Sequence, residues 1–130
     1  MLKDKNTLIK EFREGQKAYV SIENVFKPEK TKILQVIIRK IDENFIETKD
    51  GWYFEYREGY FELLLLFCKS SMEDYNEYYD YCRLFPTEKE CKDSLEFDDI
   101  VYKITGLTST QYYEHYSLEQ LREVAKILNL

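Results

Sequence analysis

The spacing of apolar residues changes twice along this chain, from helical to strand-like and back to helical. This order limits the folds that the chain can adopt. Residues 2–14 have apolar side chains at helical spacing, and the segment ends at Gly15. Between residues 17 and 68, apolar and polar side chains mostly alternate over short runs, as in half-buried strands. From residue 87 onward, helical spacing returns. The pattern predicts an α+β fold in which helices flank an antiparallel sheet.

Turn signals divide the alternating region into short strands. Asp50-Gly51 is the strongest of them and predicts a two-residue type I′ hairpin, and Glu58-Gly59 predicts another turn. Residues 60–68 are apolar on both faces, so they form a central strand or a buried helix, and their length favours a strand. Residues 83–85 are expected to be a last edge strand. We therefore expect residues 15–86 to form a small antiparallel β-barrel or strongly bent sheet of five or six strands.

The C-terminal third carries two helix-start signals. Thr87-Glu88-Lys89-Glu90 and Ser117-Leu118-Glu119-Gln120 both have the capping-box pattern. The first predicts helical segments over 88–96 and 97–105, and the second opens an amphipathic helix. Its apolar stripe consists of Leu118, Leu121, Val124, Ala125 and Leu128. We expect one N-terminal helix and two or three C-terminal helices in a single domain, 1–130, with 87–130 packed on the barrel.

Two stretches resemble known protein types. The run from Glu14-Gly15-Gln16-Lys17 through Asp50-Gly51-Trp52-Tyr53-Phe54 resembles small SH3-like barrels of the Tudor and KOW kind. The run Leu84-Phe85-Pro86-Thr87-Glu88-Lys89-Glu90 is similar to the segment that follows such a barrel in small phage proteins. These resemblances imply a barrel over about residues 15–68 and a phage or mobile-element origin.

Charge is distributed unevenly along the chain. Residues 1–49 hold 11 Lys and Arg against 8 Asp and Glu, whereas the rest of the chain holds 8 against 17, which gives a formal net charge of −6 overall. Such an excess repels nucleic acid and attracts basic surfaces. The longest uninterrupted apolar run, 63–68, is too short to span a bilayer. We expect a cytoplasmic protein with no membrane partner and no direct nucleic-acid partner.

The residues that catalysis or metal binding would need are mostly missing from the sequence. The four glycines have neither the Walker nor the dinucleotide-fingerprint spacing. Zinc ligands usually come in close pairs, but Cys68, Cys82 and Cys91 are 14 and 9 residues apart. The single histidine, His115, precedes a helix cap and is expected at the surface. We therefore expect no catalytic residues, no metal and no cofactor.

One aromatic stripe is open to two interpretations. Trp52, Phe54 and Tyr56 lie on one face of a predicted strand, where Tyr19 can join them across a barrel. Bases stack on such rings in single-strand-binding proteins. Few basic residues accompany the stripe, so core packing is the favoured interpretation, and Tyr53 is the more open side chain.

The segment 73–81 is the strongest candidate for a binding site. It holds four carboxylates and four tyrosines, and no basic residue lies between Lys69 and Arg83. Tyrosines provide rigid contact area, and rows of carboxylates can imitate a phosphate backbone. The alternative is a solvated acidic loop. The predicted partner-binding residues are Glu73, Asp74, Tyr75, Glu77, Tyr78, Tyr79, Asp80 and Tyr81, with support from Glu88, Glu90, Asp98 and Asp99.

These features predict a non-catalytic interaction protein that binds a basic groove on a host protein. By analogy, it resembles acidic nucleic-acid mimics such as the anti-CRISPR inhibitors of effector nucleases. A second hypothesis is an SH3-like accessory module that binds nucleic acid or a ribonucleoprotein through Tyr19, Lys49, Trp52 and Tyr53. A third is a small enzyme that uses a cysteine and His115.

Overall fold

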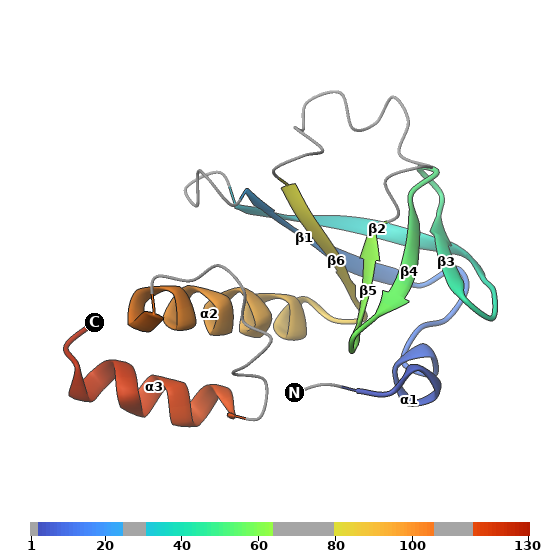
Figure 1. Cartoon of the computed structure of the whole chain (residues 1–130). Coiled ribbons are helices and arrows are strands. Elements are labelled where there is room, and N and C mark those ends of the chain that lie inside the picture. The colour runs from blue at the N-terminus through green and yellow to red at the C-terminus, as the bar shows by residue number, and fades with distance from the viewer. Residues whose placement is uncertain (1–2, 25–30, 64–79, 106–115) are drawn as a thin grey trace.

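The computed structural model describes residues 3–24, 31–63, 80–105 and 116–130. Three helices and six strands follow one another along these residues (Figure 1). They are α1 (Lys5–Ile9), β1 (Lys17–Asn24), β2 (Lys32–Ile41), β3 (Phe45–Thr48), β4 (Tyr53–Arg57), β5 (Tyr60–Leu63), β6 (Asp80–Phe85), α2 (Glu88–Thr105) and α3 (Leu118–Ile127). The predicted α+β fold is confirmed.

The six strands form a closed antiparallel barrel. Each strand pairs with the next one along the chain, and β6 returns to pair with β1. The predicted small barrel is therefore confirmed, and it is compatible with an SH3-like barrel. The expectation of an edge strand at 83–85 was wrong, because closure gives β6 a partner on both sides. Of the segment 60–68, residues 60–63 are strand β5 and the rest lie outside the described residues.

The two predicted hairpin turns differ from expectation. Gly51 has a φ of 86°, and the Thr48 N–H donates to the Trp52 carbonyl at 2.9 Å, which leaves three residues, 49–51, in the loop. This arrangement matches a three-residue hairpin rather than the expected two-residue turn. The two-residue loop is Glu58-Gly59, between the paired residues Arg57 and Tyr60, and its φ values are both positive at 49° and 99°. Positive φ at both positions is what type I′ requires.

The inward-facing residues of the strands fill the barrel with apolar side chains. Helix α1 adds Leu8, and the turn after it adds Phe12, whose ring meets the Phe61 ring edge-on at 5.6 Å between centroids. Asp4 caps α1 by accepting a hydrogen bond from the Thr7 N–H at 2.8 Å. Trp52, just before β4, also belongs to this cluster, whose buried strand residues are Ala18, Val20, Ile22, Val36, Ile38, Ile46, Phe54, Phe61, Leu63, Cys82 and Leu84.

The C-terminal helices begin at the predicted caps. The Ser117–Gln120 capping box is complete, with reciprocal bonds of 3.1 and 2.8 Å. At α2 the Thr87 hydroxyl accepts from the Glu90 N–H at 3.2 Å, but the Glu90 carboxylate turns to Lys3 instead. The two segments expected over 88–105 are one continuous helix. No helix among the described residues is both long and apolar enough to cross a membrane.

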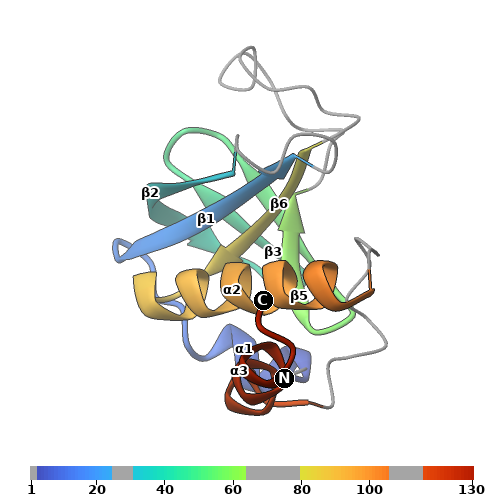
Figure 2. The same ribbon diagram turned by 90° about the vertical axis from the view of Figure 1, so that its left-hand side faces the viewer.

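Helix α2 lies between the barrel and α3 (Figures 1 and 2). The apolar residues of α3 pack on α2 in a second cluster that shares no residue with the barrel core. Its buried members are Phe97, Ile100, Val101, Leu118 and Leu121. The described residues therefore form two hydrophobic cores, one inside the barrel and one between the C-terminal helices.

Candidate functional site

The acidic, tyrosine-rich tract lies only partly within the described structure. Glu73, Asp74, Tyr75, Glu77, Tyr78 and Tyr79 lie outside the described residues. Asp80 is the first position of β6, and only its backbone is described. Tyr81 follows it and is the one member of the tract with a described side chain.

Tyr81 is bound to the outer wall of its own barrel. Its hydroxyl donates to Glu62 Oε1 on β5 at 2.5 Å, and its ring centroid lies 5.1 Å from the Arg83 guanidinium carbon. Burial raises the pKa of the Tyr81 phenol, so the group stays neutral and acts as a donor. Burial also raises the pKa of Glu62, although the Tyr81 hydroxyl and Arg83 oppose the change. The end of the tract is thus fixed to β5 and β6.

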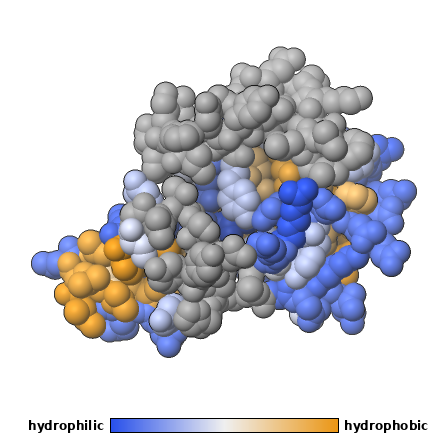
Figure 3. Space-filling model, in the orientation of Figure 1, coloured by the Kyte–Doolittle hydropathy of each residue, from blue (hydrophilic) through white to orange (hydrophobic). Residues whose placement is uncertain are grey.

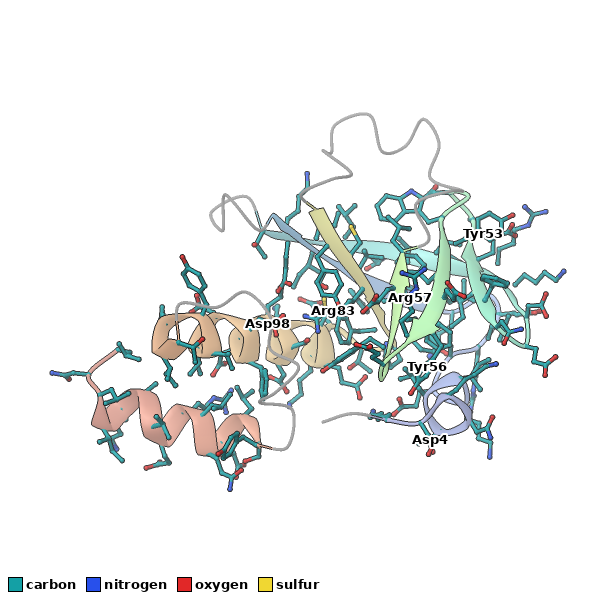
Figure 4. All side chains as sticks on the ribbon, viewed as in Figure 1. Asp4, Tyr53, Tyr56, Arg57, Arg83 and Asp98 are labelled. Atoms are coloured by element: carbon teal, nitrogen blue, oxygen red, sulfur yellow. The ribbon has the colours of Figure 1, made fainter. Side chains whose placement is uncertain are left out.

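Arg83 is the centre of a buried polar cluster beside Tyr81. Its side chain is 1% exposed and forms an ion pair with Asp98 of α2. It also lies 3.7 Å from the Glu23 carboxylate of β1, measured from Nη2 to Oε1. Figure 4 shows Arg83 and Asp98 close together between β6 and α2. We call Glu23, Arg83 and Asp98 the Arg83 cluster.

Aromatic rings surround the guanidinium of this cluster. Its central carbon lies 4.7 Å from the Tyr60 ring centroid and 5.5 Å from that of Phe85. Cations are stabilised over aromatic faces, and more so where water is excluded. The rings of Tyr60, Tyr81 and Phe85 therefore compensate part of the cost of burying the charge.

Strand alternation explains why an arginine lies here. Cys82 and Leu84 point into the barrel core, so Arg83 between them must point outward. Arg83 pairs in register with Ser21 of β1, and both are buried. Because α2 covers this part of the outer wall, an outward residue is enclosed rather than solvated.

The electrostatics of the cluster favour a neutral Glu23. Burial and the Asp98 carboxylate raise the pKa of Glu23 to about 8, and Arg83 opposes that shift. Burial alone would lower the pKa of Arg83, but Asp98 and Glu23 raise it above its usual value. At neutral pH the cluster therefore holds one cation, one carboxylate and one protonated carboxyl group.

The supporting acidic residues on α2 are not free charges. Each of the four pairs with a basic side chain of the same chain: Glu88 with Lys92, Glu90 with Lys3, Asp98 with Arg83 and Asp99 with Lys103. Asp98 is the one that the fold brings next to Tyr81 and Arg83. Only the exposed pairs, those of Glu88 and Asp99, can add to an acidic surface on α2, and their charge is locally compensated.

The barrel aromatics are mostly core residues. Trp52 is 4% exposed and Phe54 is fully buried, with 6.2 Å between their ring centroids. Tyr56 packs against the same core and donates its hydroxyl to the Lys3 carbonyl at 2.5 Å. Core packing, the favoured interpretation of this stripe, is confirmed. Tyr53 stays more exposed, and its pKa is raised by a hydrogen bond to Glu47.

Two of the three cysteines are described, and both of their side chains are buried. Cys82 lies in the barrel core, and burial raises the pKa of Cys91 on α2 to about 12. A thiol with so high a pKa has almost no nucleophilic thiolate at neutral pH. Cys68 and His115 lie outside the described residues. Within the part of the chain that the structure describes, no His, Cys, Asp and Glu side chains gather as metal ligands would.

Sequence reasoning missed the Arg83 cluster. Its one available signal is an arginine between two inward-facing residues, Cys82 and Leu84, with aromatic Tyr81 and Phe85 beside it. Its carboxylate partners are 60 and 15 positions away and have no motif spacing.

Comparisons with protein-family models, with curated proteins and with solved structures found no match to this chain. The function of this barrel with its two C-terminal helices must therefore be inferred from the chemistry of its own residues.

Proposed function

We propose that this chain is a non-catalytic interaction protein whose acidic, tyrosine-rich tract, residues 73–81, binds a basic groove on a nucleic-acid-handling host protein. The tract acts as a mimic of a phosphate backbone. Its carboxylates speed the encounter, and its tyrosines hold the complex. A CRISPR effector nuclease is the kind of host protein that offers such a groove.

The observation that carries this proposal is the attachment of Tyr81. The tract leads directly into β6, and its last residue is held on the barrel wall by Glu62 and Arg83. A binding segment with a fixed end loses less conformational freedom when it binds than one free at both ends. Tyr81 therefore positions the tract, and Tyr75, Tyr78 and Tyr79 remain as the contact tyrosines.

The two rival hypotheses find less support in the described residues. Base stacking needs exposed rings, but Trp52 is enclosed in the barrel core. Thiol catalysis needs an accessible thiolate, but Cys82 and Cys91 are buried thiols. The proposed interaction requires neither an exposed Trp52 ring nor a reactive thiolate.

The test measures competition with nucleic acid. A fluorescently labelled DNA duplex is bound to each member of a panel of purified CRISPR effector nucleases, and the chain is titrated in while anisotropy is followed. We expect the chain to displace the duplex from at least one effector, with an association rate that falls as salt rises. Failure to displace the duplex from any effector, even at low salt, would contradict the nucleic-acid mimic.

Two quadruple variants with the same change of charge locate the surface. The test variant converts Glu73, Asp74, Glu77 and Asp80 to amides. The control converts four exposed acids elsewhere, namely Glu43, Asp50, Glu119 and Glu123. The test variant should associate more slowly and with a flatter salt dependence, whereas the control should stay near wild type. Equal effects of the two variants would mean that net charge matters and that the tract is a solvated loop.

A further inference from the structure

Among the described residues, the barrel core and the core between the C-terminal helices share no residue. One core holds α1 and the barrel, and the other holds α2 and α3. Two residues, Pro86 and Thr87, connect β6 to α2. Separation of the α2–α3 pair from the barrel therefore leaves the described members of both cores in place.

The contact between these two parts includes a buried polar cluster. Cys91, Ser94 and Asp98 share one face of α2 and are buried or nearly so, and Asp98 meets Arg83 of the barrel there. A buried ion pair gains little net stability when its desolvation is counted. At the edge of the same contact, Lys3 and Glu90 form a half-exposed pair at 3.3 Å. Attachment of α2 thus depends strongly on the charge state of the Arg83 cluster.

The cluster has one carboxylate more than its cation can neutralise. Glu23 and Asp98 both face the single Arg83, and their side chains are 18% and 15% exposed. Among the described residues, no donor serves the buried Oδ1 of Asp98. A protonated Glu23 carboxyl provides such a donor and also removes the excess charge. Two carboxyl groups that share one site commonly retain a proton in this way.

We propose that a proton held between Glu23 and Asp98 fastens the α2–α3 pair to the barrel, and that this pair detaches more often as the pH rises towards 8. The open state retains the closed barrel and the apolar core between the helices. It exposes the outer wall of β1 and β6, including Ser21 and Arg83. This inference does not depend on the proposed function.

The groups around Glu23 determine the pH range. Arg83 and Tyr81 face it from β6, Asp98 and Cys91 from α2, and Lys32 on β2 pairs in register with the adjacent Ile22. Tyr60 and Glu62 of β5 lie against Arg83 and Tyr81. Within the described part of the chain, Arg83 opposes protonation of Glu23, whose pKa burial and Asp98 raise to about 8. A solvated glutamate has a pKa of about 4.3, so opening should gain about tenfold per pH unit between these values.

The experiment uses the buried thiols as reporters. Alkylation of Cys91 reports exposure of the α2–barrel contact, and alkylation of Cys82 reports opening of the barrel core. Each rate is measured by mass spectrometry, and the rate for the urea-unfolded chain at the same pH is divided by it, which gives a protection factor. We expect the Cys91 factor to be lower than the Cys82 factor and less sensitive to low urea, as for a local opening. It should fall about tenfold per unit from pH 6 to 8 and level off above.

Two variants identify the proton carrier. Glu23→Gln keeps a donor for Asp98 but cannot ionise, so its Cys91 factor should not change with pH. Glu47→Gln is the matched control, because Glu47 is also a largely buried, arginine-paired carboxylate, but it lies on β3. This control should keep the wild-type slope. If Glu23→Gln does not fold, as judged by Trp52 emission, Asp98→Asn replaces it and should reduce the slope, because it removes the carboxylate that shares the proton.

Two results would overturn the proposal. Equal protection of Cys91 and Cys82 with the same urea dependence would mean that the whole chain opens at once. A tenfold slope that persists in the Glu23 variant would mean that another group holds the proton.

Discussion

Helix α2 contacts α3 through Phe97, Ile100 and Val101, and it contacts the barrel through Cys91 and Asp98. The α3 contact is apolar and has no directional requirement beyond shape. The barrel contact includes a buried arginine and two carboxyl groups. Apolar burial provides stability that hardly changes with pH, whereas buried charges are strongly position-dependent and pH-dependent. The face of α2 that contacts α3 therefore provides stability, whereas the face that contacts the barrel controls how α2 is placed on it.

Among the substitutions that test this difference, Arg83→Ala should cause the largest loss of unfolding free energy. The substitution leaves Glu23 and Asp98 facing each other without a cation, and breaking a buried pair in this way costs about 3–5 kcal/mol. Urea unfolding followed by the emission of Trp52 measures the loss. A triple variant with Arg83→Met, Glu23→Leu and Asp98→Leu should recover most of the stability. A loss below about 1 kcal/mol for Arg83→Ala would show that the barrel contact is not held by charge.

The apolar face should give the next largest effect. Leu121 is 4% exposed against α2, so Leu121→Ala should cost about 2–4 kcal/mol of unfolding free energy. Val124, on the same helix, is 39% exposed, and Val124→Ala should cost less than about 1 kcal/mol. The sequence pattern placed both in one stripe, so equal losses from the two would mean that α3 packs in another rotation.

Changing the pH by one unit should have a smaller effect and act on the barrel face alone. The folded state binds a proton at Glu23 below about pH 8, whereas the unfolded chain loses it near pH 4.5. This stabilisation is complete below the unfolded pKa and is lost as the pH rises through the window up to about 8. The unfolding free energy should fall by up to about 1.4 kcal/mol per pH unit in that window. Glu23→Gln should reduce this slope, whereas Leu121→Ala should shift the curve and leave its slope unchanged.

The smallest effect should come from a charge at the edge of the apolar face. Arg122 on α3 binds Glu96 on α2 through two hydrogen bonds of 2.5 and 2.9 Å, but both side chains are largely exposed. Solvent screens such pairs, so Arg122→Ala should change the urea midpoint only slightly and less still at high salt. A loss as large as that of Arg83→Ala would contradict the difference drawn between buried and exposed pairs.

The candidate site was predicted only in part. The composition of residues 73–81 predicted a binding tract, and the structure adds that Tyr81 is bound to Glu62 and Arg83. The Arg83 cluster itself could not be predicted, because two strands and a helix bring its members together. Residue type alone does not distinguish an outward arginine in water from one under a helix.

The two hairpins show a similar limit at short range. Asp50-Gly51 has the preferred type I′ residues but lies in a three-residue loop, whereas Glu58-Gly59 forms the two-residue turn. Register in the closed barrel determines how many residues each connection must contain. Glu58 adopts a φ of 49°, which is unfavourable for glutamate, because the pairing of Arg57 with Tyr60 leaves only two residues to reverse the chain.

The sequence by itself determined the order of helices and strands, a small antiparallel barrel or strongly bent sheet, and the start of α3 after its cap at Ser117. These features depend on the spacing of apolar side chains and on hydrogen bonds between near neighbours. Short segments of the sequence specify both. Only the tertiary structure decided that the barrel closes through β1 and β6, that α3 packs on α2, and that Arg83 meets Glu23 and Asp98. Those outcomes depend on contacts between distant residues, and the free energy of such contacts depends on what covers each surface after folding.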